Sequence, residues 1–180
     1  SNLLHRIRGN TSKGGQIYIF YNQSNADDNY EMTYDIANNI LDRSIYLYNL
    51  DNALITGNKL VMSQYSYGVQ AEQLAKSTIK NNQLTGYNFR NTGISLNRSN
   101  ATVSDNVISK FGTGIYVTTD FTNPTFDSLL RNTVVFNGNN GVYVSNYGRV
   151  LAQYNNTYDN YDTASYNESP SQYFQTSEFY

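Results

Sequence analysis

The chain has 180 residues, a formal net charge of −2 and only 14% charged residues, which argues against a phosphate backbone or an anionic membrane as its main partner. It has no cysteine and a single histidine, His5, which excludes a disulfide scaffold, thiolate metal sites and clusters of histidine ligands. The longest apolar runs, such as residues 58–62, are far too short to span a bilayer. Abundant asparagine and 18 tyrosines lower the helix propensity almost everywhere, which favours an all-β protein.

The first elements in chain order resemble the later repeat but are less regular. Residues 7–10 and 36–41 each lead from an aliphatic residue to an asparagine, Asn10 and Asn39. The steps between equivalent asparagines are uneven here, because 39 − 10 = 29 and 58 − 39 = 19. Residues 25–31 separate these two elements and are polar and acidic, so we expect them to form a projecting loop.

From residue 55 onward one pattern returns at a nearly fixed interval. It consists of an aliphatic residue, polar positions that end in asparagine, an apolar pair, a polar turn, and a glycine that opens an alternating strand. Successive repeats are 24, 24, 26 and 24 residues apart when these asparagines are taken as equivalent: Asn58, Asn82, Asn106, Asn132 and Asn156. We expect them to form a structural ladder in which each side-chain amide bonds the asparagines of the neighbouring coils.

The alternating strands supply the expected core. In each strand two aliphatic residues are spaced by two, as Ile115 and Val117 are, so both point to the same face. Each strand is preceded by a glycine, which we interpret as a corner with positive φ: Gly68, Gly93, Gly114 and Gly141. Short strands with a period of about 24 residues predict a right-handed parallel β-helix, a solenoid of stacked coils.

The repeat also predicts the domain boundaries. Residues 1–160 should form coils, most regularly over residues 36–160, and residues 161–180 an irregular C-terminal cap or tail. Because residues 1–7 already match a coil, we expect the chain to be a fragment of a larger protein.

The segments around Asn82, Asn106 and Asn132, with the Gly-Ile or Gly-Val strands that follow them, resemble the β-helix repeats of the pectin-lyase-like superfamily, in particular its phage tailspike and polysaccharide lyase branches. The resemblance implies a polysaccharide laid along the solenoid. The polygalacturonase signatures are missing apart from one adjacent aspartate pair, Asp27 and Asp28, and His5 lacks the context of an alginate epimerase motif.

Two segments contain candidate catalytic carboxylates. The first is the predicted acidic loop with Asp27, Asp28 and Glu31, and the second is an insertion over residues 118–127 with Asp120 and Asp127. Glycosidases use two carboxylates across a cleft, one of them protonated. The alternatives are a solvated acidic loop, which could hold a Ca²⁺ ion, and a turn capped by Asp and Pro. We expect no cofactor otherwise.

Outward tyrosines are the candidate carbohydrate-binding residues. Tyr46, Tyr48, Tyr116 and Tyr143 fall in predicted strands, and Tyr116 and Tyr143 lie between inward residues about one coil apart. A row of phenol rings on a flat sheet suits sugar stacking, and it equally suits packing against another subunit.

Together these features predict an extracellular, cell-surface or virion domain that recognises a polysaccharide. One alternative is a polysaccharide lyase, hydrolase or epimerase that uses the loop carboxylates, so whether the protein is an enzyme stays open. The other is a structural stalk of the kind found in tailspikes, which implies a homotrimer. Neither nucleic acid nor membrane insertion is expected.

Overall fold

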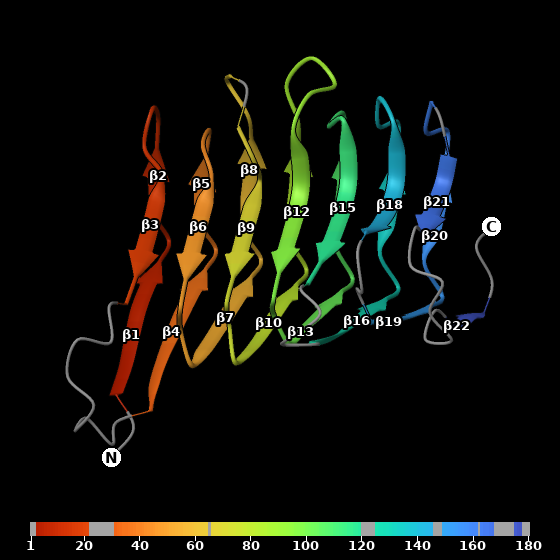
Figure 1. The fold of residues 1–180 in the computed structure, drawn as a ribbon. Coiled ribbons are helices and arrows are strands. Elements are labelled where there is room, and N and C mark those ends of the chain that lie inside the picture. The colour runs from red at the N-terminus through yellow and green to blue at the C-terminus, as the bar shows by residue number, and fades with distance from the viewer. Residues whose placement is uncertain are drawn as a thin grey trace.

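The computed structural model describes residues 3–21, 31–64, 66–119, 125–145, 149–161, 163–167 and 175–177. These residues form 22 short strands in three parallel sheets, and each coil contributes one strand to each sheet (Figure 1). Sheet A contains β1 (Leu3–Arg8), β4 (Met32–Ala37), β7 (Asn52–Thr56), β10 (Lys76–Lys80), β13 (Ala101–Ser104), β16 (Phe126–Leu130), β19 (Arg149–Gln153) and β22 (Gln175–Ser177).

Sheets B and C have seven strands each. Sheet B contains β2 (Thr11–Ser12), β5 (Ile40–Leu41), β8 (Lys59–Val61), β11 (Gln83–Thr85), β14 (Val107–Ser109), β17 (Thr133–Val135) and β20 (Asn156–Tyr158). Sheet C contains β3 (Ile17–Phe20), β6 (Ile45–Tyr48), β9 (Val69–Glu72), β12 (Thr92–Asn97), β15 (Thr113–Thr118), β18 (Asn140–Ser145) and β21 (Thr163–Asn167). The prediction of a parallel β-helix is confirmed. No helix among the described residues is long and apolar enough to cross a membrane.

Aliphatic side chains fill the interior in columns that follow the strand register. In sheet C, Ile94 aligns with Ile115 and with Val69, and all three are fully buried. In sheet A, Ile79 aligns with Ile55 and Val103 in the same way. Stacking these aliphatic side chains removes apolar area from water, which contributes roughly 25 cal/mol per Å².

A two-residue turn joins sheet A to sheet B in the same way in successive coils. The first residue has a left-handed backbone and the second is the ladder asparagine. The first position is held by Gly57 (φ 63°), Asn81 (55°), Asp105 (57°), Arg131 (54°) and Tyr154 (57°). Across this turn Arg131 forms two hydrogen bonds with Asp105, at 2.7 and 2.9 Å, and these bonds lower the pKa of the Asp105 carboxyl.

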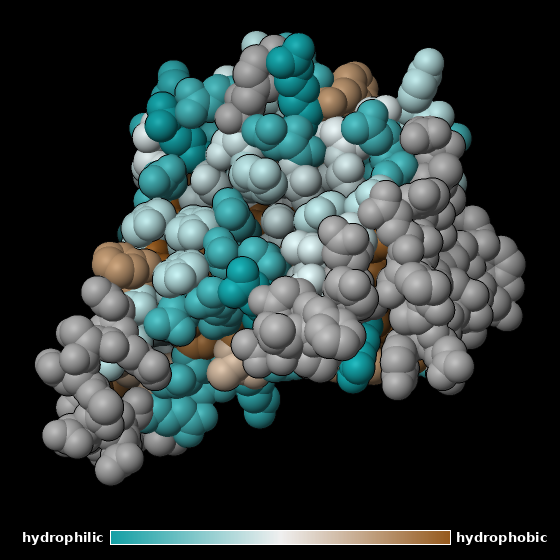
Figure 2. All heavy atoms as spheres, viewed as in Figure 1, coloured by the Kyte–Doolittle hydropathy of each residue, from teal (hydrophilic) through white to brown (hydrophobic). Residues whose placement is uncertain are grey.

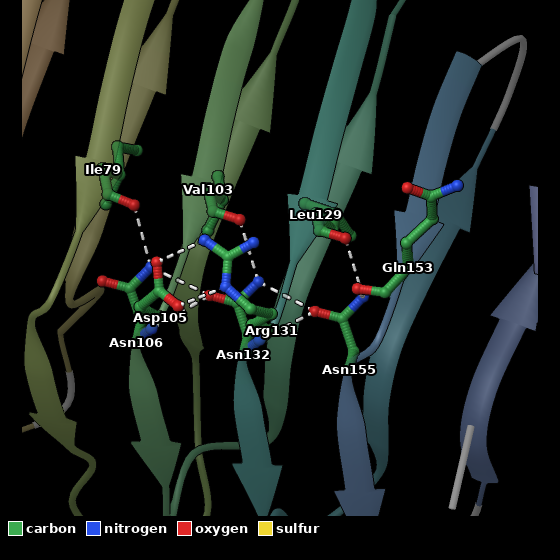
Figure 3. A network of polar contacts seen from close by, with 9 residues as sticks. All are labelled: Ile79, Val103, Asp105, Asn106, Leu129, Arg131, Asn132, Gln153 and Asn155. Carbon is green, nitrogen blue, oxygen red and sulfur yellow. Dashed lines mark hydrogen bonds and ion pairs between the residues drawn. The ribbon is translucent and has the colours of Figure 1, made fainter. Parts of the chain in front are cut away.

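The ladder asparagines are buried and hydrogen bonded to one another (Figure 3). The backbone N and Nδ2 of Asn106 donate to Oδ1 of Asn132 at 3.1 and 2.9 Å, and Nδ2 also donates to the carbonyl oxygen of Ile79 at 2.8 Å. Oδ1 of Asn106 accepts from both nitrogens of Asn82. Each interior rung is therefore fully satisfied. The pattern confirms the ladder at Asn58, Asn82, Asn106 and Asn132 and extends it upstream to Asn39 and Asn10.

The predicted last rung, Asn156, is wrong. Asn132 donates to Oδ1 of Asn155, which is buried, whereas Asn156 opens β20 and is exposed. The register explains the slip, because Ala152 aligns with Leu129 and each ladder asparagine lies three residues after that inward position. The last step is therefore 23 residues rather than 24.

The predicted role of the strand-opening glycines is also wrong, because Gly68, Gly93, Gly114 and Gly141 are not among the residues with positive φ. A Cβ on Gly93 would lie 2.4 Å from Cγ2 of Ile108 and 2.6 Å from the carbonyl oxygen of Gly114. Gly68 and Gly114 are equally crowded. Gly68, Gly93 and Gly114 are required because neighbouring coils approach too closely for any side chain.

Strands also occur beyond the predicted end of the coils at residue 160. β21 pairs with β18 in sheet C, and β22 pairs with β19 in sheet A. The segment predicted as a cap or tail thus adds strands to the solenoid.

Candidate functional site

The outer face of sheet C carries a row of aromatic and small polar side chains that the strand register aligns. Starting from the first coil, the row contains Tyr18, Tyr46, Gln70, Ser95, Tyr116 and Tyr143. Their outward direction follows from the alternation with buried residues such as Ile115 and Val117. We call this row the tyrosine face.

The tyrosines of this face form two stacked pairs. The ring centroids of Tyr18 and Tyr46 lie 4.9 Å apart with 17° between the ring planes, and those of Tyr116 and Tyr143 lie 5.4 Å apart with 11°. The predicted placement of Tyr116 and Tyr143 on one outward face is confirmed. The Tyr116 and Ser145 hydroxyls form a 2.9 Å hydrogen bond, which fixes the second pair.

A lower stretch separates the two pairs. Gln70 and Ser95 occupy the two intervening positions, and only 8% of Ser95 is exposed. Tyr46 and Tyr116 are three coils apart, which corresponds to about 14 Å at the usual strand spacing. The face thus presents two raised aromatic surfaces with a shallow polar step between them.

Glu72 lies beside this step and was not among the residues predicted from the sequence. Its carboxylate accepts hydrogen bonds from the hydroxyl of Tyr46 at 3.1 Å and from Nδ2 of Asn97 at 3.3 Å. Burial, followed by the Glu72 carboxylate, raises the pKa of Tyr46 to about 12, so the hydroxyl stays protonated and donates. Tyr48, the fourth predicted tyrosine, aligns with Glu72 in the adjacent outward row.

The described candidate carboxylates are not brought together. Glu31 is exposed just before β4, and its Oε1 accepts a 2.5 Å hydrogen bond from Asn52. Asp127 was expected in a loop, but it lies in β16 and is 1% exposed, because it occupies the inward position that aligns with Ala101. Asp27, Asp28 and Asp120 lie outside the described residues.

The Asp127 carboxyl faces the core and not the outer surface, where a sugar would bind. Its Oδ1 accepts a 2.8 Å hydrogen bond from the backbone N of Ala101, whereas Oδ2 is buried without a partner. Burial raises the pKa of this carboxyl to about 8, despite the opposing effect of the Ala101 hydrogen bond.

The described residues do not provide a transition-metal site. They contain no group of three or more His, Cys, Asp or Glu side chains that could hold an ion. His5 stacks on Tyr34 with 5.0 Å between ring centroids, and the chain has only two methionines and no cysteine. Imidazole and sulfur ligands for transition metals are therefore scarce.

Comparison with known proteins assigns the family. No curated protein and no solved structure matches the chain. A family model described as "Periplasmic copper-binding protein (NosD)" matches residues 4–179. Since this match covers nearly the whole solenoid, the chain belongs to the NosD family.

Proposed function

We propose that this chain is a polysaccharide-recognising β-helix domain that works outside the cytoplasmic membrane. The observation that carries the proposal is the tyrosine face, where two stacked ring pairs flank a polar step. Aromatic faces pack against the apolar faces of sugar rings, while carboxylate and amide groups bond hydroxyls. Glu72 and Asn97 provide such groups next to the step.

The family description supports the location. It names a periplasmic protein, which is compatible with the predicted extracytoplasmic site and favours the periplasm over a virion surface. Copper binding does not follow for this chain, because the described residues lack a donor set that fits the metal.

A depolymerase finds less support in the described residues. Glycoside cleavage requires two carboxylates about 5 to 10 Å apart across the scissile bond. Glu72 lies on the tyrosine face, but Asp127 points into the core and Glu31 precedes β4 in an early coil. Recognition without cleavage is therefore the proposal that the geometry favours.

The test is a titration of soluble acidic and neutral polysaccharides against the chain by calorimetry. Tyr143→Ser, which copies the residue at the aligned position of β12, should weaken binding at least about tenfold because it removes one stacked ring. Phe126→Ala is the matched control, since Phe126 is an exposed aromatic residue on sheet A. Its affinity should equal that of the wild type.

Each other outcome points to a different role. Release of oligosaccharide products by the wild type would replace binding with catalysis. A trimer in light scattering that binds no polysaccharide would indicate a structural stalk. Loss of oligomers in Tyr143→Ser, without any glycan response, would make the tyrosine face a subunit interface.

A further inference from the structure

A second surface feature lies at the corner where sheet B turns into sheet C, away from the tyrosine face. Here the chain forms a groove of about 640 Å³, which we call the corner groove, lined by Phe89, Phe136, Asn137, Gly138, Asp159, Asn160 and Tyr161. The loop that leads from β11 to β12 projects farthest at this edge (Figure 1). Figure 2 shows an apolar side chain protruding at the same upper edge of the molecule.

The floor of the groove is a second, short asparagine ladder. Oδ1 of Asn137 accepts from the backbone N of Phe111 at 3.1 Å, and both nitrogens of Asn137 donate to Oδ1 of Asn160 at 3.0 and 2.9 Å. Nδ2 of Asn160 donates to the carbonyl oxygen of Val134 at 3.1 Å. Because these amides are engaged within the fold, they offer little hydrogen bonding to a ligand.

One wall is the loop that contains Phe89, held in an unusual conformation. Asn88 and Phe89 both have left-handed backbones, with φ of 53° and 52°. Close packing holds the loop, since a Cβ on Gly138 would lie 2.7 Å from Cβ of Phe89, and the backbone N of Gly112 donates to the carbonyl oxygen of Asn91 at 2.9 Å. Phe89 is nevertheless 54% exposed, so the backbone presents this residue to solvent.

Two more aromatic side chains complete the lining. Phe136 is 50% exposed and is supported by Tyr158, whose ring centroid lies 6.1 Å away in an edge-on arrangement. Tyr161 is 89% exposed, and its backbone N donates to the carbonyl oxygen of Asn137 at 2.9 Å. Three aromatic rings thus reach one hollow from three of four successive corner turns, those that follow β11, β17 and β20.

Asp159 is the only charged residue among the described residues that line the corner groove. Arg90 lines a separate hollow on the other side of Phe89, together with Asn91 and Thr113. Aromatic faces attract cations, and a carboxylate beside them adds charge complementarity. We propose that the corner groove binds an organic cation of the quaternary ammonium class, such as a trimethylammonium group.

A sugar suits this groove less well than it suits the tyrosine face. Sugar recognition combines aromatic stacking with several free donors and acceptors. In the corner groove both asparagine side chains are already hydrogen bonded, which leaves aromatic rings, the Tyr161 hydroxyl and one carboxylate. The proposal is independent of polysaccharide binding, because it concerns different residues and a different ligand.

The test is calorimetry of the chain with choline chloride and with 3,3-dimethylbutanol, its uncharged analogue of nearly the same shape, at constant ionic strength. Choline should bind at least about tenfold more tightly than the neutral alcohol. Phe136→Leu keeps an apolar side chain but removes the ring, and Asp159→Asn removes the charge. Each should weaken choline binding about five- to tenfold.

Tyr154→Leu is the matched control, because Tyr154 is also an exposed aromatic residue with positive φ (57°, against 54° for Phe136) but does not line the groove. It should bind choline like the wild type. Equal affinity for choline and the alcohol would reduce the groove to a merely apolar hollow and overturn the proposal. It would also be overturned by absence of choline binding, or by an oligosaccharide that binds there in a Phe136-dependent manner.

Discussion

The coil that contains β16 buries the side chains of Asn132 and Asp127 and, of these two, satisfies only Asn132. Asn132 accepts from both nitrogens of Asn106 and donates to Val103 and Asn155. Asp127 has one bonded oxygen and one buried oxygen without a partner. Both neighbouring coils supply an asparagine at the position of Asn132, whereas Ala101 and Val150 flank Asp127. At these two positions, repetition from coil to coil, rather than burial itself, separates the satisfied side chain from the unsatisfied one.

The largest expected effect comes from removing the ionisable group with Asp127→Asn. The native pKa of Asp127 is raised to about 8 from an ordinary 3.8, so between these values the native state keeps a proton that the unfolded chain has released. Wild-type stability should therefore fall as the pH rises from about 4 to about 8, by a total on the order of 5 kcal/mol.

Asparagine resembles the protonated carboxyl in shape and can still accept from Ala101 through Oδ1. Asp127→Asn should thus abolish this pH dependence and be the more stable protein at pH 8. Urea unfolding at several pH values measures the free energy of unfolding of both proteins and thus this pH dependence. Parallel pH profiles for variant and wild type would show that Asp127 is ionised in the native state.

The second prediction leaves polar groups of the ladder buried without a hydrogen-bond partner, as Oδ2 of Asp127 already is. Asn106→Ala deprives both nitrogens of Asn82 of their acceptor and the carbonyl oxygen of Ile79 of its side-chain donor. The free energy of unfolding should fall by about 4 kcal/mol. Asn156→Ala is the control and should change it by less than about 0.5 kcal/mol, because Asn156 is exposed. A comparable loss of stability in both variants would indicate that Asn156 is a rung of the ladder, as first expected from the sequence.

The third prediction concerns packing without polar groups. Gly93→Ala places a methyl group against Ile108 and the Gly114 carbonyl and should destabilise the chain by about 2 to 3 kcal/mol. Gly9→Ala separates this effect from backbone strain, since Gly9 has φ 68° but nothing within 4 Å of an added Cβ. It should cost only about 1 kcal/mol. Thermal unfolding of both variants compares the two costs, and a smaller loss for Gly93→Ala would show that adjacent coils can separate.

The sequence was sufficient for the fold because the repeat encodes it directly. Aliphatic residues spaced by two and an asparagine near every twenty-fourth position fix strand direction, core and turn at once. The mistaken rung at Asn156 arose from counting a constant period. The spacing of three residues from the inward aliphatic position to the asparagine is the local rule, and it would have selected Asn155.

The site was harder to predict because it depends on which coils become neighbours. The outward direction of Tyr116 and Tyr143 follows from alternation within each strand. Glu72 was missed, since its contact with Tyr46 joins residues 26 positions apart on adjacent coils. The corner groove was missed for a similar reason. Phe89, Phe136 and Tyr161 follow no common motif, and their turns have left-handed residues that no local pattern marked.

The Tyr46–Glu72 pair is intermediate between the buried, satisfied Asn132 and the buried, unsatisfied Asp127. It is polar, partly buried and hydrogen bonded at the edge of the tyrosine face. Glu72→Gln removes the negative charge but keeps an acceptor for the Tyr46 hydroxyl. The pKa of Tyr46 should fall only part of the way from about 12 toward 10.0, because burial, the larger cause, remains. Stability should change by less than about 0.5 kcal/mol, as is usual for a pair near the surface.

NMR titration of ring-labelled tyrosine follows the Tyr46 resonance directly, with Tyr116→Phe to help assign the spectrum. An unchanged pKa would show that Glu72 does not face Tyr46 in solution and would remove it from the polar step.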